Sequence, residues 1–154
     1  MWAGPGVRQR LAYRGAEVLK SERPGVGEEP GAAGPPCLKD RSGADTRDSA
    51  YYLSANRAKK SVAVNIATAE GQDMIRKIAA VSDVFVETYM FGKLAESGLD
   101  YERLRAINTR RGYCSITGFG HSVRYRERPG YGSVCQPVVG LMRSTGQQER
   151  KPAN

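Results

Sequence analysis

The segment Lys60–Glu87, KSVAVNIATAEGQDMIRKIAAVSDVFVE, decides the predicted fold of this chain. It opens with a β-branched stretch, Lys60–Ile66, and closes with a short apolar run, Asp83–Glu87, so both ends are predicted to be strands. The closing run is typical of a strand covered on both faces. Thr68 is expected to cap a helix between them, with a buried face at Met74, Ile75, Ile78 and Ala79. This pattern indicates a βαβ unit with a right-handed crossover.

A second unit of the same kind follows. Leu94–Ile107 is predicted to be helical with a break at Gly98, and Gly112–Thr117 is the next predicted strand. Strands that alternate with helices predict an α/β fold with a mostly parallel sheet.

The first third of the chain is less regular. Val7–Tyr13 predicts a short helix that Gly15 ends, and Ala16–Lys20 predicts a strand. Residues 24–50 are rich in glycine, proline and charge, with Pro35-Pro36 near the centre, and are predicted to form one long loop.

The composition narrows the possible partners. The chain has 154 residues and a net charge of +8, which suits nucleic acid, an acidic membrane surface or a phosphate-rich small molecule. No apolar run approaches the roughly 20 residues of a membrane span, so no membrane insertion is expected. The three cysteines, Cys37, Cys114 and Cys135, lie far apart and are expected to be free thiols.

Few residues suggest metal or nucleophilic chemistry. His121 is the single histidine, without a neighbouring cysteine pair or carboxylate cluster, so neither a metal site nor a Ser-His-Asp site is predicted. Gly118-Phe119-Gly120 follows a predicted strand but lacks the third glycine of a dinucleotide fingerprint, because Val123 stands there. Arginines alternate with Tyr125 in the loop Arg124–Arg128, which leaves a basic nucleic-acid-binding domain as an alternative.

Several runs, in the same order along the chain, resemble blocks of the family III CoA-transferases, the group that includes formyl-CoA transferase. The runs are Ala3-Gly4-Pro5, Gly15–Gly25 (GAEVLKSERPG), Gly34-Pro35-Pro36, Tyr51–Asn65 (YYLSANRAKKSVAVN), Asp83–Glu87, Gly92–Leu94, Gly98–Tyr101, Tyr113–Gly120 (YCSITGFG) and Leu141–Gly146 (LMRSTG). The resemblance implies that residues 1–154 are part of a Rossmann-like large domain, incomplete as given. Residues 147–154 are expected to form a disordered tail.

The resemblance also implies a function. Members move CoA from an acyl-CoA to a carboxylic acid, here expected to be dicarboxylic, through an aspartyl intermediate, and two subunits interlock as a homodimer. The substrate is a coenzyme A thioester, and no covalently bound cofactor, nucleic acid or membrane partner is expected. The expected location is the cytoplasm, with the mitochondrial matrix as the alternative.

Five positions are expected to contact CoA by resemblance. Ala3 matches a turn that touches CoA, Arg23 matches an arginine that binds it, and Tyr89 matches an aromatic residue of the pantetheine wall. Val64 and Ile66 match positions that line the adenine end, and a plain core role is the alternative for both.

The chain departs from the family pattern in four places. The strand that precedes the Ala-Gly-Pro turn is missing, Thr88 replaces an asparagine, Gly132 replaces an acid after Gly-Tyr, and Gly120–Arg124 replaces a Gly-Gln-Thr-Gly-Pro turn.

The nucleophilic aspartate of the family is expected beyond Asn154. No catalytic residue is therefore predicted within the chain, which is expected to be inactive alone. A non-catalytic CoA-binding remnant and a relative of the α-methylacyl-CoA racemases are the alternatives. Tyr131 favours the transferases, since the racemases have a histidine there.

Overall fold

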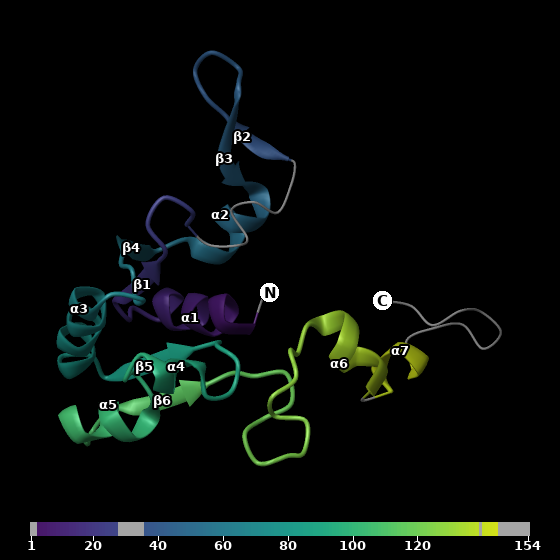
Figure 1. The fold of residues 1–154 in the computed structure, drawn as a ribbon. Coiled ribbons are helices and arrows are strands. Elements are labelled where there is room, and N and C mark those ends of the chain that lie inside the picture. Colours follow the sequence, from purple (N-terminus) through teal and green to yellow (C-terminus); the bar gives the residue numbers. More distant parts are fainter. Residues whose placement is uncertain (1–2, 28–35, 139, 145–154) are drawn as a thin grey trace.

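The computed structural model describes residues 3–27, 36–138 and 140–144 (Figure 1). The elements in chain order are α1 (Ala3–Tyr13), β1 (Val18–Glu22), β2 (Cys37–Lys39), β3 (Asp45–Ser49), α2 (Ala50–Asn56), β4 (Lys59–Ala63), α3 (Ala69–Ala80), β5 (Val84–Glu87), α4 (Lys93–Glu96), α5 (Tyr101–Ile107), β6 (Gly112–Ser115), α6 (Gly132–Val138) and α7 (Leu141–Ser144). The α/β class predicted from the sequence is confirmed. The predicted tail, 147–154, lies outside the described residues.

Two parallel strand pairs organise the fold. β1 runs beside β4, from Val18 opposite Lys59 to Glu22 opposite Ala63, and β5 runs beside β6. Helix α1 contacts both β1 and β5 (Figure 1). Among the described strands, β4 and β5, the two strands of the first predicted βαβ unit, are not hydrogen-bonded to each other. Helix α3 instead carries the chain from one pair to the other, and the unit whose strands do pair is β5–α4–α5–β6.

Helix α3 begins as the sequence predicts. The Thr68 hydroxyl accepts a hydrogen bond from the Gly71 N–H at 3.1 Å, and Glu70 lies in the first turn, where the helix dipole favours an acid. Ile75 and Ala79 are buried, whereas Met74 is 47% exposed. The expectation for Met74 is wrong because the buried face runs through Gly71, Ile75 and Ala79, a step of four residues that leaves Met74 turned toward solvent.

One core joins the two strand pairs. Its buried residues are Val64, Ile75, Ala79, Leu94, Leu99 and Leu104. Phe85 of β5 and Tyr113 of β6 pack against it. Val84 is 50% exposed, so the expectation that this strand is covered on both faces is wrong for the described residues.

The N-terminal third contains more structure than predicted. Helix α1 begins at Ala3, four residues before the predicted start, and ends before Gly15, whose φ of 90° suits glycine. Within the predicted loop, β2 and β3 form an antiparallel hairpin. The Asp40 carboxylate closes its turn by accepting hydrogen bonds from the Ser42 hydroxyl and from the N–H groups of Ala44 and Ser42, and these bonds lower the Asp40 pKa. The loop prediction failed because β2 has only three residues and β3 is polar in sequence (DTRDS), so neither shows the apolar pattern of a strand.

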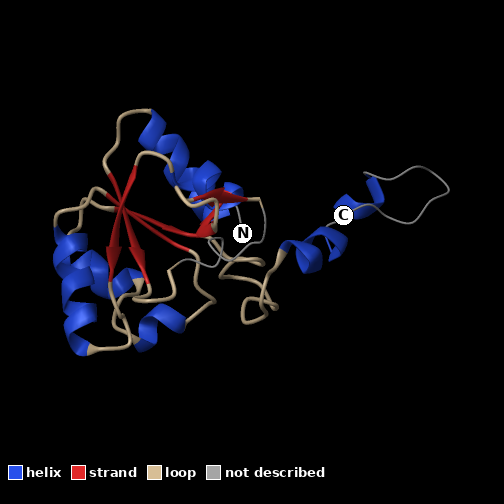
Figure 2. Ribbon diagram, turned by 90° about the horizontal axis from the view of Figure 1, so that it is seen from above, coloured by secondary structure: helices blue, strands red, loops and turns tan. Residues whose placement is uncertain are grey.

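The last two helices, α6 and α7, lie apart from the strands in both views (Figures 1 and 2). No helix within the described residues has the length and apolar character to cross a membrane.

We expect Thr68→Ala to lower the free energy of unfolding by about 1 kcal/mol, because the Gly71 N–H loses its acceptor. Urea unfolding followed by circular dichroism measures the change. Thr68→Ser keeps the hydroxyl and should stay near wild type. Equal losses in both variants would contradict a capping role.

Candidate functional site

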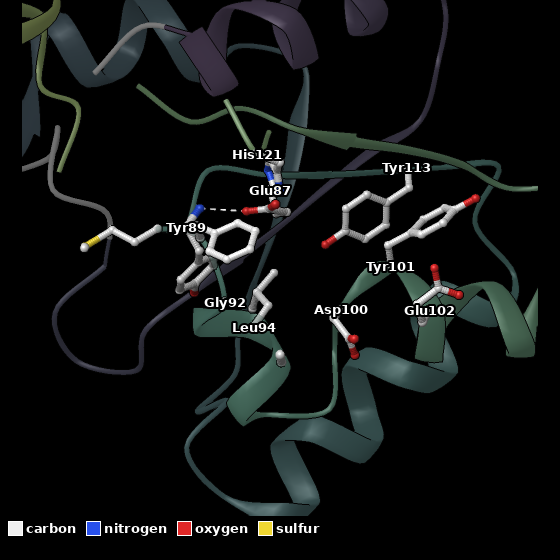
Figure 3. A pocket seen from close by; sticks show the side chains of 12 residues that line it. Glu87, Tyr89, Gly92, Leu94, Asp100, Tyr101, Glu102, Tyr113 and His121 are labelled. Atoms are coloured by element: carbon white, nitrogen blue, oxygen red, sulfur yellow. Dashed lines mark hydrogen bonds between the residues drawn. The ribbon is translucent and has the colours of Figure 1, made fainter. Parts of the chain in front are cut away.

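A pocket of about 370 Å³ opens where β5 and β6 end (Figure 3). Its walls come from the segment after β5, from α4, from the start of α5 and from the loop after β6. The carboxyl ends of parallel strands are the usual place for ligands in α/β folds. Because β5 and β6 are parallel, residues from both strand ends reach this one cavity.

Glu87 is the last residue of β5 and lies at the back of the pocket (Figure 3). It is 8% exposed, and its carboxylate accepts a hydrogen bond from the Tyr89 N–H at 2.7 Å. That bond holds the chain in place directly after the strand.

Tyr113 forms an aromatic wall. Its ring stacks on Phe85 with centroids 5.6 Å apart and meets the edge of Tyr101 at 5.5 Å. Burial raises the pKa of Tyr113 well above its usual range, and the carboxylates of Glu87 and Asp100 raise it further. The hydroxyl therefore stays neutral and can both donate and accept hydrogen bonds.

His121 connects the loop after β6 to the strand ends. Its Nε2 lies 2.7 Å from the Ser115 hydroxyl oxygen, and its ring meets Phe91 edge-on at 5.3 Å. The Arg126 guanidinium lies 4.6 Å from the centre of the same Phe91 ring. From the sequence, His121 is predicted to be an isolated loop residue. No spacing pattern predicts its contact with Phe91, which lies 30 positions earlier in the chain.

No group of three or more His, Cys, Asp or Glu side chains within the described ranges is arranged to hold a metal ion. None of the three cysteines, all of which the structure describes, forms a disulfide.

Comparison with known proteins identifies the family. The model of CoA-transferase family III matches residues 1–154. The chain belongs to CoA-transferase family III. The resemblance noted from the sequence motifs is thereby confirmed.

Named relatives within family III are similar over nearly the whole chain. Succinyl-CoA:glutarate CoA-transferase of Homo sapiens is 45% identical over 150 residues, which are 97% of this chain and 33% of that protein. Succinate–glutarate CoA-transferase of Agrobacterium fabrum is 39% identical over 97% of this chain and 37% of its own length. The chain thus spans about a third of the length of these relatives.

A solved family structure supports the fold. The crystal structure of a CAIB/BAIF family protein from Brucella suis superposes with a TM-score of 0.91 at 41% identity, over 99% of this chain and 39% of that one. The arrangement of α/β elements described above is therefore that of the family.

Three of the five positions expected to contact CoA lie around the end of β5. Tyr89 lines the pocket, and burial raises the pKa of its hydroxyl. The positive charge of Arg23 opposes this rise, so the two side chains lie within electrostatic reach of each other. Ala3 begins α1, and the next residue, Gly4, lies so close to Thr88 that an added Cβ would overlap the Thr88 methyl group. A CoA role for these three residues stays a prediction.

The other two positions follow β4. Val64 is 5% exposed in the core, and Ile66 is half-buried against the same cluster. Their side chains help hold α3 to the sheet, and a contact with the adenine end of CoA stays a prediction for both.

Proposed function

We propose that this chain is the CoA-binding portion of a transferase that moves CoA between an acyl-CoA and a carboxylic acid. The observation that carries the proposal is the 45% identity with succinyl-CoA:glutarate CoA-transferase over 97% of the chain. This relative and the one from Agrobacterium fabrum both have glutarate in their names, which supports a dicarboxylic acid as the acceptor.

CoA would reach the chain beside Arg23. This arginine is exposed just after β1, in a turn that the Gly27 N–H closes by donating to the Arg23 carbonyl at 2.9 Å. A planar guanidinium suits the pyrophosphate and 3′-phosphate of CoA, because it donates two parallel hydrogen bonds to phosphate oxygens. Tyr89, within electrostatic reach of Arg23, offers an aromatic surface for the pantetheine arm.

The proposed chemistry is covalent. The aspartate carboxylate attacks the thioester carbonyl and displaces the CoA thiolate, which leaves a mixed anhydride. The thiolate then attacks the aspartyl carbonyl of the anhydride, forms the aspartyl-CoA thioester and releases the donor carboxylate. The acceptor carboxylate displaces the thiolate again to form a second anhydride, and attack of the thiolate on the acceptor carbonyl releases the new acyl-CoA and restores the aspartate. We place this aspartate beyond Asn154, so the 154 residues bind CoA and do not turn it over by themselves. A homodimer of the longer protein is part of the same proposal.

Arg23→Ala should weaken CoA binding about tenfold, the usual value of a hydrogen bond to a charged group. Isothermal titration calorimetry with CoA and the 154-residue chain measures the dissociation constant.

Arg76→Ala is the matched control, because it removes the same charge from α3, where Arg76 pairs with Asp73 at 3.2 Å. An equal loss in both variants would show that CoA responds only to net charge. Unchanged binding in Arg23→Ala would remove Arg23 from the site.

A further inference from the structure

The charge inside the pocket is opposite to the charge of the chain. The chain carries a net charge of +8, yet the pocket is lined by the carboxylates of Glu87, Asp100 and Glu102. None of the described residues that line it is a lysine or an arginine. This cavity therefore repels phosphates and carboxylates and attracts cations.

Glu87 is the buried carboxylate of the three, whereas Glu102 is exposed to solvent. Asp100 forms an ion pair with Arg103 at 2.9 Å, whereas no described lysine or arginine pairs with Glu87. Charged groups that are this deeply buried normally have an ionic partner, because the desolvation cost is otherwise uncompensated. Its one hydrogen bond, from the Tyr89 N–H, leaves carboxylate lone pairs available to a ligand.

The walls around Glu87 suit a cation with an apolar body. Leu94, 6% exposed, lies between Glu87 and Asp100 in the close view (Figure 3). The rings of Phe91 and Tyr113 also line the pocket, and aromatic faces attract cations. Phe91 already carries the Arg126 guanidinium on its ring, and that arginine pairs with Glu127 at 3.7 Å rather than with Glu87.

We propose that this pocket binds a small primary alkylammonium compound, whose N–H groups donate to the Glu87 carboxylate while its carbon chain packs on Leu94 and Phe91. A volume of about 370 Å³ is ample for an ammonium with a few carbons. A primary ammonium is favoured over a quaternary one because Glu87 and the Tyr113 hydroxyl can accept hydrogen bonds from its N–H groups, and a quaternary ammonium has no N–H group. The proposal does not rest on CoA binding at Arg23, although Tyr89, which also lines this pocket, is the residue proposed above to face the pantetheine arm.

Calorimetric titration of the 154-residue chain at pH 7 with n-butylammonium chloride tests the proposal. We expect saturable binding of n-butylammonium, and binding at least about tenfold weaker for 1-butanol, which has the same shape without the charge. Butyrate should not bind. Equal binding of 1-butanol would show that the pocket binds the carbon chain and not the charge. Tighter binding of tetramethylammonium would show that the aromatic rings, and not hydrogen bonds to Glu87, bind the cation. Either result overturns the proposal.

Glu87→Gln tests the anchor, because it keeps the size of the side chain and removes the charge. We expect n-butylammonium to bind at least about tenfold more weakly to this variant. Asp73→Asn removes an equal charge from the exposed face of α3 and should leave binding unchanged. If Glu87→Gln does not fold by circular dichroism, Tyr113→Phe replaces it, with a weaker loss expected for n-butylammonium and none for 1-butanol. Wild-type affinity in the variant used would overturn the assignment.

Discussion

Leu104→Ala should lower the free energy of unfolding by about 2–5 kcal/mol, among the largest effects expected for any single substitution in this chain. Leu104 lies in α5, is 0% exposed and belongs to the core cluster that includes residues of α3 and α4. Truncation removes buried apolar surface and leaves a cavity that the packed neighbours fill only in part. Urea unfolding monitored by circular dichroism measures the loss.

Leu38→Ala is the control for that measurement. It makes the same chemical change in the β2–β3 hairpin, where Leu38 is 54% exposed, and should alter stability by no more than about 0.5 kcal/mol. Similar losses at both positions would mean that α5 does not share the core with α3. The comparison thus tests whether the two strand pairs form one folded unit.

Local signals along the chain predicted the elements better than their pairing. The Thr68 cap and the strands around Val62 and Phe85 follow from residue type and periodicity, which act over a few neighbouring positions. Whether β4 lies beside β1 or β5 depends on contacts between segments far apart in the chain. The sequence pattern of a single βαβ unit does not contain that information.

The pocket was missed for a related reason. Glu87, Asp100 and His121 are widely spaced in the sequence and match no motif, yet all three line one cavity. They meet there because β5 and β6 pair in parallel, with Glu87 opposite Ser115, and therefore end at the same edge. The family resemblance directed attention to Tyr89, which lines the same cavity, but a resemblance does not indicate where uncompensated charge is buried.

Gly71→Ala is the second substitution with a large expected effect on stability. It is expected to destabilise the protein, although helix propensity alone predicts that alanine stabilises a helix. Alanine is favoured over glycine by about 1 kcal/mol inside a helix. At this position, however, a Cβ would overlap the backbone carbonyl of Asn65, which also accepts hydrogen bonds from the Thr68 N–H and hydroxyl. Because backbone atoms cannot move aside as a flexible side chain does, α3 must shift away from β4. We expect a net loss of about 1–3 kcal/mol.

Gly132→Ala is the matched control, because it makes the same change in α6 where a Cβ would meet only the Gln136 side chain at 3.7 Å. At this position helix propensity should outweigh any steric cost, so the free energy of unfolding should stay unchanged or rise by up to about 1 kcal/mol. Chemical unfolding of both variants separates the two effects. If Gly71→Ala is as stable as wild type, the start of α3 does not lie against the end of β4, and the position of this helix between the two strand pairs is wrong. If both variants lose stability equally, backbone overlap at Asn65 is not the cause.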